Sequence, residues 1–218
     1  IPPVDGVNLK NVFFMRTPDD AVALREAVES GDIKRAVVVG GGYIGLEVAE
    51  NISSLGVRVS VIDMAKHIAP GFDEEFSEYI ENHLADQGIM TFTETKLEAI
   101  LGEEKVEKIQ TNKRAIKADA VILSVGIRAN TDFLMDTGIE LMPNKTIKVN
   151  EFLQTNIEDI YAVGDCTTVM NRLTKEPVWS PMGSTANIAG RIAAKNIAGA
   201  NIAYQGVLAT AVAKLPEL

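Results

Sequence analysis

The stretch AVVVGGGYIGLEVAE, residues 36–50, decides the fold of this chain. Four apolar residues run into a glycine turn, and a helical pattern begins just after it. Gly40, Gly42 and Gly45 form G-x-G-x-x-G, in which the first glycine makes the turn, the second admits a pyrophosphate and the third lets helix and strand pack closely. The start of the helix offers N–H groups and a positive dipole end to an anion. The stretch therefore predicts a dinucleotide-binding turn.

An acidic residue follows the glycines at a suitable distance. Asp63 ends a second predicted strand, VRVSVID, close to the ~20-residue spacing of a ribose-binding acid. A carboxylate there accepts hydrogen bonds from a ribose 2′-hydroxyl and repels a 2′-phosphate, which favours NADH over NADPH. Lys66 is near enough in sequence to weaken this preference. The alternative is that the glycines form a tight turn that binds nothing. Because Asp63 is present as well as the glycines, this alternative is the less favoured interpretation.

Helical and strand patterns alternate along the first half of the chain. Thr17, Pro18 and Asp20 form a helix start with a capping box, and this helix is expected to end near Ser30. Further helices are expected at 43–55 and 73–87, and buried strands at 35–39, 57–63 and 118–126. Short strands at 89–92, 96–101 and 106–111 suggest a small antiparallel meander. The predicted fold class is α/β, a doubly wound parallel sheet with this meander.

A second section is expected to begin near Asp132. Its landmarks are IKVN at 147–150, IYAVGD at 160–165 and a helix at about 184–198. Gly126, which follows a predicted strand, either lets a ligand approach or makes an ordinary turn. Gly164 and Asp165 stand at another expected strand end, where the acid either binds a hydroxyl of a second nucleotide or caps a loop.

Composition excludes several classes of function. The formal net charge is −9, which argues against nucleic acid and anionic membranes as partners. No apolar run approaches the ~20 residues of a membrane span. The single cysteine, Cys166, fits the reducing cytoplasm. His67 and His83 have no His or Cys neighbours at metal-binding spacing, so we expect surface or helix positions and no metal site. Because the first residue is Ile1, we expect the natural N-terminus to lie upstream.

Several segments together resemble one known family. They are GGGYIGLEVAE, the strand-end Asp63, SVGIRANT, TNIEDIYAVGDC and PMGSTANIAGRIAAKNIAG, in this order. The chain resembles, over essentially its whole length, the pyridine nucleotide-disulfide oxidoreductase flavoproteins, in particular the coenzyme A-disulfide reductase, NADH oxidase and NADH peroxidase branch. The resemblance implies an NAD domain at 13–131 inserted into a split FAD domain, with 1–12 and 132–203 as part of the latter. Residues 204–218 would begin the link to a dimerisation domain.

The resemblance also implies roles for individual residues on the NAD side. Gly40, Gly42, Ile44 and Gly45 would hold the pyrophosphate loop of NAD, and Asp63 the adenosine ribose. Tyr43 would cover the flavin ring and yield to nicotinamide. Glu47 would lie near the nicotinamide, paired with a lysine from the other half of the FAD domain. Gly126 would lie beside the nicotinamide end.

On the FAD side, the resemblance implies that Gly164 and Asp165 contact the ribityl chain of the flavin. The helix start at Ser184, Thr185 and Ala186 would point at the pyrimidine edge of the ring, where its dipole stabilises negative charge. The first FAD fingerprint and the redox-active cysteine of the family have no match in this chain. Cys166 stands in a different place, so the chain is expected to be an interior fragment of a longer enzyme.

The resemblance implies an FAD-dependent oxidoreductase of the cytoplasm that works as a homodimer. It would pass hydride from NADH to FAD and on to a small-molecule acceptor: a disulfide such as that of coenzyme A, oxygen or peroxide. Two alternatives stay open from the residues alone. One is a cysteine-free reductase that delivers electrons to a redox protein. The other is a nucleotide-binding module with no activity of its own.

Overall fold

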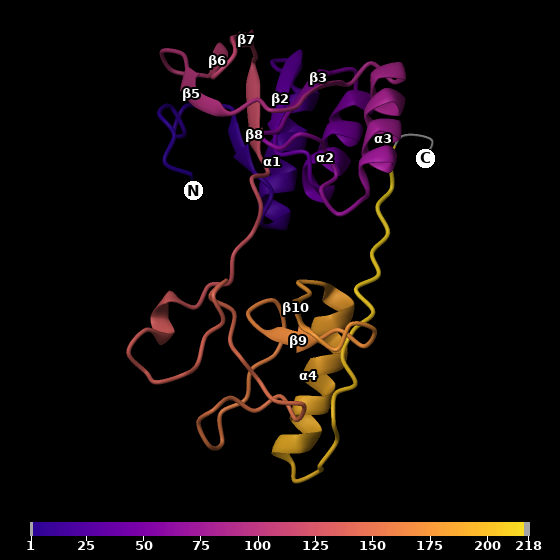
Figure 1. Cartoon of the computed structure of the whole chain (residues 1–218). Coiled ribbons are helices and arrows are strands. Elements are labelled where there is room, and N and C mark those ends of the chain that lie inside the picture. Colours follow the sequence, from indigo (N-terminus) through magenta and orange to yellow (C-terminus); the bar gives the residue numbers. More distant parts are fainter. Residues whose placement is uncertain (1, 216–218) are drawn as a thin grey trace. The chain divides into compact units, whose positions relative to one another are not determined.

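A computed structural model describes residues 2–215 and divides into two compact units (Figure 1). Unit 1 comprises the described residues of Ile1–Gly126 and Ala213–Leu218, and unit 2 comprises Ile127–Val212. The first unit thus ends a few residues before the predicted boundary at 131. It also includes residues 2–12, which the resemblance assigned to the FAD domain. The units' identities as NAD and FAD domains remain predictions.

Unit 1 is built on a five-stranded sheet in the order β1-β8-β2-β3-β4, with every neighbouring pair parallel. The strands are β1 (Val12–Phe14), β8 (Ala120–Leu123), β2 (Arg35–Val39), β3 (Arg58–Ile62) and β4 (Met90–Phe92). Three of them confirm the expected buried strands. In the sheet, β2 lies between β3, which follows it in the chain, and β8, which comes much later. The order of the strands therefore reverses beside β2, which makes this a topological switch point.

The segment 89–92 was wrongly predicted to belong to the antiparallel meander. β4 pairs in parallel with β3, with Ser60 opposite Met90. Helix α3 (Glu74–Asp86) carries the chain back along the sheet, and a strand that follows such a crossover enters parallel to the one before it. The meander instead consists of β5 (Leu97–Leu101), β6 (Lys108–Thr111) and β7 (Ala115–Lys117), the last of which had not been predicted.

Alternate residues of β2 face opposite sides of the sheet and enter two separate clusters. Val38 packs with residues of α1 (Pro18–Glu29), α2 (Tyr43–Ser54) and α3, so the three helices cover one face. Val37 packs with Ile100 and Ile109, so the antiparallel sheet covers the other. The capping box of α1 is confirmed, with the Thr17 N–H donating to Asp20 Oδ2 at 2.8 Å.

An ion pair fastens the starts of β2 and β8 to each other. Asp119 Oδ1 lies 2.9 Å from Arg35 Nη2, and Asp119 Oδ2 accepts the backbone N–H groups of Lys34 and Arg35. The hydrogen bond from the Arg35 side chain, followed by the backbone donors, lowers the pKa of Asp119. The carboxylate therefore stays charged where two adjacent strands enter the sheet.

Unit 2 contains less regular structure. It holds a 3-10 turn (Asp132–Leu134), an antiparallel pair of β9 (Thr168–Met170) and β10 (Pro177–Trp179), and the helix α4 (Gly183–Ile197). The landmarks at 147–150 and 160–165 form only isolated bridges, such as Ile147 with Thr167. Asp165 therefore does not end a strand, contrary to expectation, because its segment pairs only through the isolated bridge between Tyr161 and Gln154.

Candidate dinucleotide-binding site

The three glycines of the loop after β2 differ in what surrounds them. A Cβ at Gly45 would lie 1.9 Å from the carbonyl oxygen of Gly40, and one at Gly40 would lie 2.2 Å from that of Ser124. Gly40 also has a φ of +108°, which side-chain-bearing residues rarely adopt. A Cβ at Gly42 would meet nothing within 4 Å. Packing thus accounts for Gly40 and Gly45, whereas Gly42 faces open space that a ligand can enter.

The start of α2 is built to face an anion. Its N-cap is Gly42, which has no side chain to accept the first N–H groups of the helix. The first N–H groups of α2 and the positive end of its dipole lie together at this end of the helix, where an anion is favoured. Ile44 lies in this first turn and is 45% exposed.

Asp63 follows β3 and is held by the glycine loop itself. Its Oδ2 accepts the backbone N–H of Gly41 at 2.7 Å, and its Oδ1 accepts that of Ala65 at 2.8 Å. Each carboxylate oxygen keeps a second lone pair for a ligand hydroxyl. The predicted ribose acid and the predicted pyrophosphate loop are therefore in direct contact.

These residues open on a cavity of about 830 Å³ in unit 1. The carboxyl ends of β2, β3 and β8 meet there, and the volume lies in the usual range for small-molecule sites. The cavity brings together four of the predicted residues: Gly40, Gly42, Asp63 and Gly126. Its lining also includes residues that sequence reasoning missed, among them Ser124, Lys96 and Glu98.

Tyr43 and Glu47 lie apart from this cavity. Tyr43 is 41% exposed, packs edge-on against Phe72 with ring centroids 6.2 Å apart, and lines a smaller pocket of about 230 Å³ with Leu46 and Phe76. Glu47 lies one turn further along α2 and is exposed. Neither residue lines the larger cavity, and both are accessible on the surface of unit 1.

Lys66, expected to weaken the preference for NADH, has a different partner. Its Nζ donates to Glu74 Oε1 at 2.5 Å, and the same oxygen lies 3.0 Å from His67 Nε2. The hydrogen bond from Lys66, and then that of His67, lowers the pKa of Glu74. Both basic side chains are thus engaged with α3, and Lys66 is not among the residues that line the cavity.

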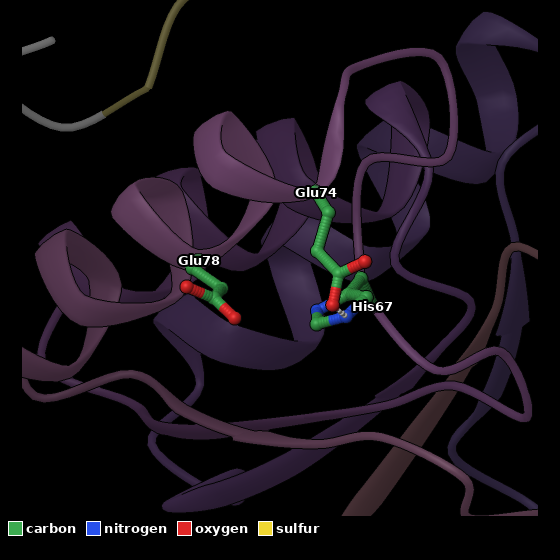
Figure 2. Close-up of side chains that lie close together, drawn as sticks. All are labelled: His67, Glu74 and Glu78. Atoms are coloured by element: carbon green, nitrogen blue, oxygen red, sulfur yellow. Dashed lines mark hydrogen bonds and ion pairs between the residues drawn. The ribbon is translucent and has the colours of Figure 1, made fainter.

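Figure 2 shows His67 and Glu74 pointing toward each other, with Glu78 one turn further along α3. His67 lies in the loop before α3 rather than in a helix, and its side chain is 20% exposed. The three side chains offer atoms within 4.8 Å of one another. Because Lys66 already contacts the Glu74 carboxylate, these contacts describe an ion-pair network.

In unit 2, the structure brings the predicted flavin contacts together in part. Gly164 has a φ of +85°, and a Cβ there would lie 3.8 Å from the Cβ of Ala186 at the start of α4. Ser184 and Thr185 line a cavity of about 400 Å³. Thr185 is buried and shares a hydrogen bond of 3.0 Å with the Ser180 hydroxyl.

Asp165 and Cys166 follow Gly164 directly. Asp165 is exposed, and its backbone carbonyl accepts the indole N–H of Trp179 at 2.8 Å. The thiol of Cys166 donates to the Val163 carbonyl at 3.4 Å. Burial, with a smaller contribution from the charge of Asp165, raises the pKa of this thiol. A raised pKa lowers the fraction of the reactive thiolate.

Two further observations concern the chain as a whole. Among residues 2–215, no helix is both long enough and apolar enough to cross a membrane. A protein-family model described as pyridine nucleotide-disulphide oxidoreductase matches residues 1–192.

Individual proteins are similar over the entire chain. The NADH oxidase of Methanocaldococcus jannaschii is 38% identical, and the NAD(P)H coenzyme A polysulfide/persulfide reductase of Pyrococcus horikoshii is 36% identical. Each match covers 100% of this chain and 49% of the relative. The crystal structure of an FAD-dependent pyridine nucleotide-disulphide oxidoreductase from Desulfovibrio vulgaris superimposes with a TM-score of 0.88 at 35% identity, over 100% of this chain and 55% of that one. The chain thus spans about half the length of these relatives, and it belongs to the pyridine nucleotide-disulphide oxidoreductase family.

Proposed function

We propose that the intact protein is an FAD-dependent oxidoreductase that draws its electrons from NADH and delivers them to a small acceptor. The proposed use of NADH rests on one observation, the hydrogen bond between Asp63 and the glycine loop, whose residues line the cavity. When bound, NADH supplies a hydride and FAD accepts it. The names of the relatives support this reading, since one is an NADH oxidase and another a coenzyme A polysulfide/persulfide reductase.

The residues of unit 1 fit NADH. The open space at Gly42 admits a pyrophosphate, and the N–H groups at the start of α2 donate to its oxygens. The two Asp63 oxygens orient the adenosine ribose by accepting from its hydroxyls, and their charge opposes a 2′-phosphate. Gly126 has a φ of +92° and open space at the position of its missing Cβ, so it would allow the nicotinamide end to approach closely. We therefore assign NAD binding to the predicted domain at 13–131.

The residues of unit 2 supply part of a flavin site. Gly164 and the start of α4 lie against each other, and the N–H groups of Ser184, Thr185 and Ala186 stabilise negative charge on the flavin ring. Asp165 accepts from hydroxyls of the ribityl chain. Tyr43 and Glu47 act at the nicotinamide and flavin rings in the intact enzyme. The rest of the FAD site belongs to the remaining length of the protein, and the FAD assignment covers 1–12 and 132–203.

The acceptor is a small disulfide such as that of coenzyme A, oxygen or peroxide, and the enzyme is a cytoplasmic homodimer. The test uses the full-length protein with FAD and follows NADH consumption with each acceptor in turn. We expect a flavoprotein that oxidises NADH with at least one of them. Rapid turnover only with a redox protein as acceptor would support the electron-transfer alternative. Failure of the 218-residue chain to bind NADH would overturn the assignment of unit 1.

A further inference from the structure

Ser124 stands out among the residues that line the large cavity of unit 1. Its hydroxyl oxygen is shielded from solvent and has no hydrogen-bond partner among the described residues. A shielded hydroxyl without a partner costs stability, so such groups in native proteins usually have a ligand or water to bind. The backbone N–H of Ser124 does have a partner, because it donates to the Val39 carbonyl at 2.8 Å. The hydroxyl oxygen is therefore the unpartnered group of this residue that a ligand could use.

The strand order places Ser124 along the path of a dinucleotide. β3 and β8 lie on opposite sides of β2, and the three strands end at the same edge of the sheet. Asp63 follows β3, the glycine loop follows β2, and Ser124 follows β8. A ligand whose adenosine ribose is held at Asp63 and whose pyrophosphate is held at Gly42 extends its remaining half over β8.

From this arrangement we infer that the Ser124 hydroxyl forms a hydrogen bond to the nicotinamide-ribose half of NADH and positions that half. The inference rests on the proposed function, in which the chain binds NADH. Rotation about the Cα–Cβ bond moves the hydroxyl among three staggered positions at little cost, so it can turn into the cavity that the residue lines. Gly126, two residues on, leaves open space for the same half of the ligand. Ser124 is therefore a positioning residue for the end of the cofactor that carries the hydride.

The test is calorimetric titration of the 218-residue chain and its Ser124→Ala variant with NADH and with ADP, which lacks the nicotinamide-ribose half. Loss of one hydrogen bond should weaken NADH binding about 2- to 12-fold and leave ADP binding unchanged. The melting temperature of the ligand-free variant should stay the same or rise, because the removed hydroxyl has no partner to lose. Ser54→Ala is the matched control, since the Ser54 hydroxyl bonds the Asn51 carbonyl on exposed helix surface and lies outside the cavity.

Equal NADH affinity in the Ser124→Ala variant would overturn the inference while leaving NADH binding by unit 1 intact. Equal weakening of ADP and NADH, or a lowered melting temperature with weakened binding of both, would also overturn it, because the hydroxyl would then serve the fold. If the unmutated chain binds no NADH, it is the proposed function that fails.

Discussion

The Asp63 carboxylate and the backbone N–H of Gly41 are joined by a hydrogen bond of 2.7 Å. This bond fixes the orientation of the acid to the glycine loop before any ligand arrives. A second bond, from the Ala65 N–H to the other oxygen, prevents the side chain from turning away. The predicted ribose-binding acid and the predicted phosphate-binding loop therefore form one preorganised unit, an arrangement that would reduce the ordering cost of binding.

Replacement of Asp63 tests the preference for NADH. The unmutated chain should bind NADH at least about fivefold more tightly than NADPH, because like charges a few ångströms apart cost ~1–4 kcal/mol. Asp63→Ser removes the charge and should narrow or reverse the difference. Lys66→Ala is the control from the same loop, and it should leave the ratio nearly unchanged, since Lys66 pairs with Glu74. Calorimetric titration that finds tighter NADPH binding by the unmutated chain would contradict the assignment.

Gly42→Val should abolish NADH binding while the chain still folds. The valine side chain would fill the space of the pyrophosphate, and the φ of −80° at this position suits a branched residue. Gly45→Val should instead lower the melting temperature sharply, because its side chain would meet the Gly40 carbonyl oxygen. Circular dichroism melts and NADH titrations separate the two outcomes. Retained NADH affinity in Gly42→Val would mean that the glycines form only a turn.

The 218-residue chain on its own should purify without flavin and should not oxidise NADH, even with added FAD. In unit 2, Gly164, Asp165 and the start of α4 offer a few hydrogen bonds of ~0.5–1.5 kcal/mol each, against a cost of ~4–15 kcal/mol for immobilising a large ligand. The absorbance spectrum after gel filtration with excess FAD gives the answer. A stoichiometric yellow protein would show that the FAD assignment of the residues is wrong.

The ion pair between Asp119 and Arg35 should matter for stability in a pH-dependent way. The lowered pKa of Asp119 means that its contribution is present above about pH 4, the ordinary range of the carboxyl, and is lost as pH falls through the folded-state pKa. Asp119→Ala should cost about 1.5–3 kcal/mol at neutral pH, because charged hydrogen bonds at two strand starts disappear. Urea unfolding at neutral and acidic pH should show a smaller acid sensitivity in the variant. A matching pH dependence in both proteins would disprove the role of this carboxylate.

Local patterns predicted the parts of the fold that depend on local chemistry. The capping box at Thr17, the glycine loop and the acid at Asp63 each have a signature within a few residues, and the structure has all three. The pairing of β4 could not be predicted, because a three-residue strand carries no signal for a parallel or an antiparallel neighbour. In unit 2, IKVN at 147–150 has a strand-like sequence, but a strand also needs a partner of matching length.

Only some of the residues that line the cavity could be predicted, because the others are brought there by long-range packing. Gly40, Gly42 and Gly126 follow buried strands, and Gly40 and Gly126 also have positive φ angles, so the sequence points to them. Lys96 and Glu98 reach the cavity through the placement of the antiparallel sheet, which no local motif encodes. Ser124 had one available signal, since it directly follows a buried strand at the edge where the other site residues lie.

The unequal crowding around the three glycines bears on how such sequences diverge. A descendant that no longer used a dinucleotide would still need Gly40 and Gly45, because backbone oxygens occupy the places of their side chains. Nothing but a ligand forbids a side chain at Gly42. Among descendants of this chain, drift at the middle glycine with the outer two unchanged would mark the lineages that have abandoned the cofactor, even where the fold is fully preserved.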